Sequence, residues 1–207
     1  VHRGVHFLSN LATDKFEETR VAVQQLVNAK YSREIIFTKG TTDSINLVAN
    51  AFRLLLKKDD EVIISELEHH SNIVPWQLCC DQSGANLKII PLKKNGELDF
   101  CRFEKLLTRR TRLVAISHVS NTLGTINPVE KIIKKAHEAG AKVLIDGAQA
   151  ASHLKLNMQK LNADLYCFSA HKMYGPTGVG VLYGKEGVLN TFPPYQGGGE
   201  MIKNVTF

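Results

Sequence analysis

The sequence predicts an α/β domain in which a mainly parallel sheet is covered by helices on both faces. Short apolar runs alternate along the chain with amphipathic segments, which is the pattern of strands connected by helices. The 207 residues are enough for one sizeable core, and 43% hydrophobic and 22% charged residues are ordinary for a globular protein. Polar residues gather directly after several of the apolar runs, so a site at one edge of the sheet is also predicted.

The first predicted element is an amphipathic helix over residues 13–29, in which Phe16, Val23, Leu26 and Val27 share one face. A strand over 34–37 follows, and a glycine turn then leads into a helix that opens in hydroxyl and acidic residues at 41–44 and runs to 52. The next elements are a strand over 61–65, a helix over 73–80 with Pro75 in its first turn, and a strand over 87–91.

The second half repeats the alternation and ends in two strands on either side of a polar loop. The predicted elements are helix 99–107, strand 112–117, helix 129–139, which Gly140 stops, strand 142–145, and the apolar runs 164–168 and 179–183. The loop between the last two runs holds Ser169, His171 and Lys172, followed by a Gly-Pro pair and further glycines. The stretch 193–199, rich in proline and glycine, is predicted to be a linker or an active-site loop.

Composition argues against several classes of partner and compartment. The formal charge of +6 comes from scattered lysines and arginines, which indicates solvated helix ends and no nucleic-acid partner, although a small anionic ligand fits equally well. No apolar run approaches the ~20 residues that span a bilayer, so no membrane association is expected. The four cysteines form no C-x-x-C pair, which favours a reducing, cytoplasmic location.

The candidate site consists of polar residues that follow predicted strands. Because the carboxyl ends of parallel strands meet at one edge of a sheet, these side chains are expected to converge on one crevice. They are Thr41, Thr42, His69, His70, His118, Asn121, Asp146, Gln149, Ser169, His171 and Lys172.

Each of these residues has an ordinary structural interpretation beside the functional one. Thr41 and Thr42 at a helix start suit a phosphate, yet plain N-capping is favoured when they are taken alone. Asp146 can hold a protonated ring nitrogen or cap the next helix, and His69 can stack on a flat cofactor or be structural. Lys172 can form an imine if burial lowers its pKa, or it can be a solvated turn lysine. The histidines lack metal-ligand spacing, so no metal site is predicted.

Taken together, the set favours one cofactor. An imine-forming lysine, a carboxylate for a ring nitrogen, a phosphate cradle and a flat stacking partner are what pyridoxal 5'-phosphate (PLP) requires of a protein.

The motifs in their order resemble the class V aminotransferase family of PLP enzymes, and within it the cysteine desulfurases, most closely the SUF-type branch. The resemblance implies a three-layer α/β sandwich with a mainly parallel mixed sheet, the large domain of a fold-type I aminotransferase. The matching segments run across the whole chain: VHRGVHFLS, GTTDSINLVAN, LEHHSNIVPWQ, ISHVSNTLGTINP, VLIDGAQA, FSAHKMYGPTGVGVLYGK and GGGEMI.

The resemblance implies a role for each site residue. Lys172 looks like the Schiff-base lysine that also moves the substrate Cα proton, and His69 like the ring-stacking residue and a second catalytic group. Asp146 looks like the partner of the ring nitrogen, and Gln149 like the donor to the cofactor's phenolic oxygen. The remaining implied roles are phosphate contacts for Thr41, Thr42, Ser169 and His171, a substrate-carboxylate contact for Asn121, and a place near the active site or dimer interface for His2 and Arg3.

The function implied is conversion of L-cysteine to L-alanine, with the sulfur passing to an enzyme persulfide for iron–sulfur cluster assembly. A homodimer and a sulfur-acceptor protein are implied as well. The family's nucleophilic cysteine and its substrate-clamping arginine match nothing in this chain, so residues 1–207 are expected to be the PLP-binding large domain, without an N-terminal extension and a small domain. Ala170 stands where the SUF-type branch more often has glycine. The alternatives are a selenocysteine lyase, another class V lyase or aminotransferase, and an inactive PLP-binding or scaffold fragment.

Overall fold

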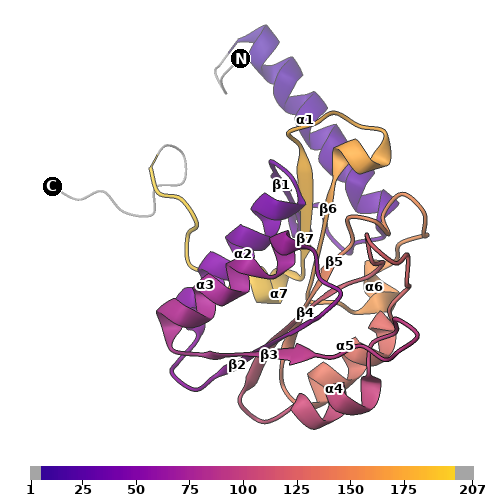
Figure 1. Ribbon diagram of the computed structural model, residues 1–207. Helices are drawn as coiled ribbons and strands as arrows, with labels where there is room; N and C mark the ends of the chain where they lie inside the picture. Colours follow the sequence, from indigo (N-terminus) through magenta and orange to yellow (C-terminus); the bar gives the residue numbers. More distant parts are fainter. Residues whose placement is uncertain (1–5, 199–207) are drawn as a thin grey trace, which may run out of the picture.

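A mixed sheet of seven strands forms the centre of the computed structural model, which describes residues 6–198 (Figure 1). The strand order is β1-β7-β6-β5-β4-β2-β3. Strands β2 to β6 pair in parallel, and β7 is antiparallel to both of its neighbours. The strands are β1 Ile35–Thr38, β2 Glu61–Ser65, β3 Asn86–Ile90, β4 Thr111–Ser117, β5 Lys142–Asp146, β6 Leu165–Ser169 and β7 Gly180–Gly184.

Helices cover both faces of this sheet, which confirms the predicted three-layer α/β architecture. On one face, Ile45, Val48 and Phe52 of α2 and Trp76 of α3 form a core with alternate residues of the strands. On the other face, α4 and α5 pack against the intervening strand residues. The helices are α1 Phe7–Leu26, α2 Thr41–Leu55, α3 Val74–Ser83, α4 Phe100–Leu106, α5 Val129–Glu138, α6 Met158–Leu161 and α7 Glu186–Leu189, with 3-10 turns η1 Ser32–Glu34, η2 His70–Asn72 and η3 Ala170–Met173.

Helix α1 differs from its prediction in both its limits and its buried face. It begins at Phe7, six residues earlier than predicted, because the His6 side chain accepts a hydrogen bond from the Ser9 N–H and caps the first turn. Val27 is buried, but Leu26, which was expected on the same face, is 55% exposed. Consecutive helical residues are about 100° apart, so burial of Val27 directs Leu26 outward.

The short elements were not predicted because they contain too few residues to show a periodicity. These are η1, η2, α6, α7 and the turn η3, which carries Lys172 where only a loop was predicted. Pro75 lies in the first turn of α3, as predicted. No helix within residues 6–198 is long and apolar enough to cross a membrane.

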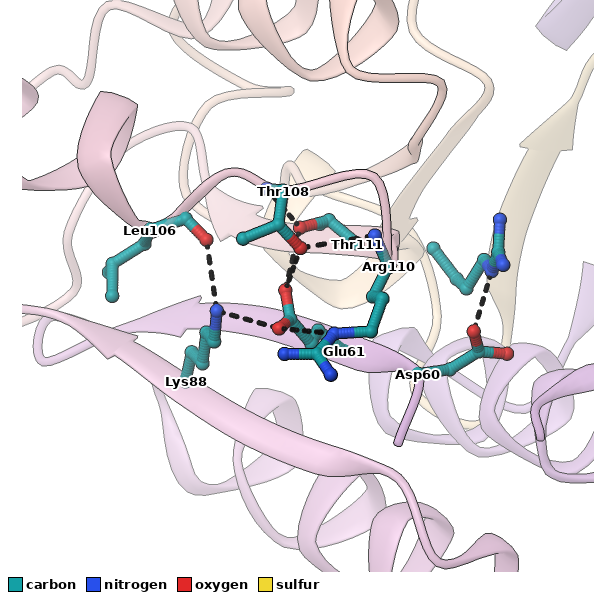
Figure 2. A network of polar contacts seen from close by, with 8 residues as sticks. Asp60, Glu61, Lys88, Leu106, Thr108, Arg110 and Thr111 are labelled. Carbon is teal, nitrogen blue, oxygen red and sulfur yellow. Dashed lines mark hydrogen bonds and ion pairs between the residues drawn. The ribbon is translucent and has the colours of Figure 1, made fainter. Parts of the chain in front are cut away.

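A charge network around the buried Glu61 lies at the amino-terminal ends of β2, β3 and β4 (Figure 2). Glu61, the first residue of β2, forms an ion pair with Lys88 at 2.8 Å and accepts hydrogen bonds from Thr108 and Thr111. Arg110 lies 3.5 Å from the same carboxylate. Burial opposes the charged form of Glu61, but the bonds from Lys88 and the threonines outweigh burial and lower its pKa. The network joins β2, β3 and β4 at the end of the sheet opposite the polar strand ends.

Candidate active site

One pocket of about 270 Å³ at the carboxyl ends of the strands holds nine of the eleven residues that were predicted to converge there. Another cavity, of about 460 Å³ beside the start of α5, contains none of them. We take the smaller pocket as the candidate site, since the predicted chemistry gathers there. The nine residues are Thr41, Thr42, His69, Asn121, Asp146, Gln149, Ser169, His171 and Lys172.

The start of α2 and the end of β6 form one wall of this pocket. Ser169 Oγ accepts a hydrogen bond from the Thr41 N–H at 2.8 Å and lies 2.7 Å from Thr41 Oγ1. Gly40 precedes the helix with φ 154°, and a Cβ on Gly180 of β7 would stand 2.4 Å from the Gly40 Cα. The helix therefore begins against the sheet because glycines occupy both positions. A helix N-terminus beside hydroxyl groups is a favourable place for an anion.

Asp146 ends β5 at the base of the pocket and is 5% exposed. Its Oδ1 accepts the Ala148 N–H at 2.9 Å. Burial raises the pKa of Asp146, while the Ala148 N–H and the positive charges of Lys172 and His69 oppose that rise. The turn after Asp146 needs Gly147, since a Cβ there would lie 2.0 Å from the Tyr166 ring.

Lys172 is carried by η3, directly after β6. Tyr174 ends this turn in the left-handed region with φ 62°, and the Gly175 N–H donates to the Ala170 carbonyl at 2.9 Å. The turn places the lysine among the pocket residues together with Asp146. An amine and a buried carboxylate therefore face the same small volume.

His69 and Asn121 come from two further strand ends. His69 caps η2, and its Nδ1 accepts the Ser71 N–H at 3.2 Å, so a neutral ring carries its proton on Nε2. Asn121 is exposed in the loop after β4 and reaches the same pocket. These residues supply an aromatic ring and an amide to the pocket that Lys172 also lines.

Two members of the strand-end set, His70 and His118, do not line this pocket. His70 is exposed in η2, next to His69. His118 faces a different cavity. It lines the larger cavity, and its Nδ1 lies 3.0 Å from the Tyr166 hydroxyl. Adjacent residues at the end of a strand point to opposite faces, so Ser117 lines the pocket and His118 does not.

Four further pocket residues were missed by the sequence prediction. Ser117 could have been found, because it ends β4 in register with Asp146 of β5. The other three residues have small side chains, and nothing in their sequence pattern suggested a role in binding. The four are Ser71, Ser117, Val119 and Ala148.

The residues present fit a flat, phosphorylated ring with a basic nitrogen. Within residues 6–198, no cationic side chain lies within ion-pair distance of Asp146, so a buried carboxylate remains for a protonated ring nitrogen. The start of α2 offers the anion site, and Lys172 offers an amine. The fold and this pocket together define a cofactor-binding domain of the PLP-dependent transferase type.

The chain belongs to the aminotransferase class-V family, whose description matches residues 1–207. A cysteine desulfurase of Enterobacter sp. (strain 638) is 52% identical over 207 residues, which are 100% of this chain and 51% of that protein. The chain thus spans about half the length of the curated relatives it matches.

Two solved structures show the same architecture. The apo cysteine desulfurase of Thermococcus onnurineus NA1 superposes with a TM-score of 0.93 at 44% identity, covering 99% of this chain and 51% of that one. A C-DES mutant with glycine covalently linked to its PLP cofactor superposes with a TM-score of 0.83 at 25% identity, covering 91% and 50%. The fold likeness confirms the predicted fold class.

Proposed function

We propose that residues 1–207 are the PLP-binding large domain of a cysteine desulfurase. The observation that supports this most is the meeting of Lys172, Asp146 and the start of α2 in one pocket. The family and the desulfurase relatives at 50–52% identity support the substrate, L-cysteine. The products are L-alanine and a persulfide.

Each pocket residue has a task in this proposal. Asp146 would hold the proton on the ring nitrogen, and His69 would face the ring. Lys172 would hold the cofactor through its amine and could take up the Cα proton of the substrate. When bound, PLP supplies an electron sink that stabilises negative charge at Cα. The remaining assignments are phosphate binding by Thr41, Thr42, Ser169 and His171, a hydrogen bond from Gln149 to the phenolic oxygen, and substrate-carboxylate binding by Asn121.

The sulfur-accepting cysteine is not among the pocket residues. Cys79 and Cys80 are buried in α3, and burial raises their pKa to about 12 and about 11. Cys167 is buried in β6, and burial raises its pKa as well. Cys101 is exposed on α4. We therefore propose that these 207 residues bind PLP but need a cysteine from outside them to form the persulfide.

The cellular setting follows the family and is likewise proposed. The intact protein is a cytoplasmic homodimer that passes sulfur to an acceptor protein for iron–sulfur cluster assembly. The scattered surface charge favours neither nucleic acid nor a membrane as partner.

Replacing the lysine tests the covalent chemistry. Wild-type chain reconstituted with PLP should show the visible absorbance band of a lysine-linked cofactor, and Lys172→Ala should lose that band. Lys94→Ala, at an exposed lysine in a turn, is the matched control and should keep it. A visible band that survives in Lys172→Ala and withstands dialysis would contradict the assignment.

An activity assay tests whether these 207 residues catalyse the complete reaction by themselves. L-cysteine added to the PLP-loaded chain should yield no alanine, since none of the four cysteines lines the pocket. Adding the remaining half of a desulfurase relative to the same chain should restore alanine release. Stoichiometric persulfide formation by the 207 residues alone would refute the proposed division of labour.

A further inference from the structure

Glu68 is a buried carboxyl group that lies directly behind the pocket and has no task in the proposed chemistry. It precedes His69 and is 7% exposed. Its Oε1 accepts hydrogen bonds from Ser65 Oγ at 2.5 Å and from Ser117 Oγ at 3.4 Å. Ser117 itself lines the pocket, and Ser65 ends β2. One carboxyl group therefore joins the ends of β2 and β4.

The other carboxyl oxygen extends this network into α3. Glu68 Oε2 accepts a hydrogen bond from Asn72 Nδ2 at 2.6 Å, and Asn72 Oδ1 accepts one from the Trp76 indole N–H at 2.8 Å. The Asn72 and Trp76 side chains are fully buried. The turn that carries His69 is thus held at both ends by side chains bound to Glu68 or linked to it.

The surroundings of Glu68 disfavour a negative charge. Burial and the nearby Asp146 carboxylate raise the pKa of Glu68 to about 7, and the bonds from Ser65 and Asn72 oppose only part of that rise. Within residues 6–198, no lysine, arginine or histidine lies within ion-pair distance of Glu68. The neighbours on β2, β4 and η2 are the uncharged Ser65, Ser117 and Asn72.

We propose that Glu68 is a positioning residue of the site, whose protonated carboxyl group keeps a second negative charge away from Asp146. Its protonated carboxyl fixes Ser117 and the turn that bears His69. Loss of the proton places a second negative charge near Asp146. This inference rests on the proposed function for the cofactor, but the protonation of Glu68 can be measured without any cofactor.

Trp76 provides that measurement, because it is the only tryptophan in the sequence and is linked to Glu68 through Asn72. The fluorescence of the cofactor-free chain should show a transition near neutral pH. The transition should be absent in Glu68→Gln, whose side chain keeps the shape and hydrogen bonds but cannot ionise. The control Glu138→Gln, at an exposed residue of α5, should retain it. A transition that persists in Glu68→Gln, or none in the wild type, would overturn the proposal.

PLP affinity tests whether Glu68 positions the site or only stabilises the fold. Glu68→Gln should bind PLP within about threefold of the wild type, whereas Glu68→Ala should bind at least about tenfold more weakly, because the buried donor of Asn72 loses its acceptor. Above neutral pH the wild type gains a charge that Glu68→Gln lacks, so the visible band of the bound cofactor should titrate at lower pH in the variant.

The Trp76 fluorescence and the PLP-binding measurements distinguish failure of this inference from failure of the proposed function. If the wild type bound no PLP, the proposed function would fail, and the Trp76 transition would still decide the protonation of Glu68. If PLP bound equally well to the wild type and to Glu68→Ala, with unchanged titration of its visible band, the positioning role would be refuted while the proposed function stood.

Discussion

At the scale of single residues, the site depends on a few groups held in unusual surroundings. Asp146 is nearly fully buried, and within residues 6–198 its side chain accepts one hydrogen bond, from the Ala148 N–H, which leaves the carboxylate available to the proposed cationic ring nitrogen. Glu68 lies close enough to interact with it electrostatically. We propose that the two acids differ in charge: Asp146 is the anion toward the ligand, whereas Glu68, whose pKa burial raises to about 7, holds a proton below that pH.

Asp146→Asn tests whether the negative charge of Asp146 contributes to PLP binding. The substitution keeps the shape but removes the charge, so PLP should bind about 10- to 100-fold more weakly, as expected for the loss of a charged hydrogen bond. Equilibrium dialysis gives the affinity directly. Asp81→Asn, at an exposed residue of α3, should bind PLP like the wild type. An unchanged affinity in Asp146→Asn would remove the carboxylate from the site.

At the scale of elements, the site is built by the contact of α2 with β6 and β7. The Thr41–Ser169 bonds join residues 128 positions apart, and they form only because β7 approaches Gly40 closely. Glycine at position 180 is therefore a requirement of the helix–sheet contact rather than of the strand.

Gly180→Ala should weaken the contact between the start of α2 and β7. Because its Cβ would overlap the Gly40 backbone, the free energy of unfolding should fall by about 1–3 kcal/mol, and PLP affinity should fall with it. Urea unfolding measures the first effect. The control is Gly187→Ala in α7, where a Cβ meets no atom within 4 Å, and its stability should change by less than about 0.5 kcal/mol. Equal stability of the two variants would show that β7 can move away from Gly40 freely.

At the scale of the whole molecule, two buried acids lie at opposite ends of the strands. They change the free energy of unfolding with pH in opposite directions. The pKa of Glu61 is lowered on folding, so its contribution is present above the unfolded value of about 4.3 and is lost as the pH falls through the folded value. The pKa of Glu68 is raised to about 7, so the folded state loses stability as the pH rises from about 4.3 to that value.

Urea unfolding across pH should separate these two contributions. Glu61→Gln should unfold more easily at neutral pH, by about 1–3 kcal/mol, with a difference that shrinks in acid. Glu68→Gln should gain stability relative to the wild type as the pH rises toward 7 and should match it near pH 4. Glu97→Gln, at an exposed residue, should follow the wild type throughout. A Glu68→Gln difference that does not vary with pH would contradict the assigned pKa.

Much of the fold was predictable from local patterns. The run at 61–65 was predicted with its observed limits, because an apolar segment between polar turns has few other interpretations. Nine of the eleven residues predicted to converge lie together, because each follows a strand that ends on the same side of the sheet. The start of α1 was missed since its cap is a histidine, which is not a usual N-cap residue. Glu68 was missed as well, because a glutamate beside His69 gives no signal of burial.

The sequence by itself determined the order of the elements, the kinds of side chain at the strand ends and the family. Only the tertiary structure decided that β7 inserts antiparallel between β1 and β6, that Ser169 meets Thr41, and that His118 faces away from the pocket. Strand order and side-chain facing depend on how two layers of helices pack against one sheet, which no local pattern encodes. The protonation of Glu68 depends on desolvation, and desolvation exists only once the chain has folded around it.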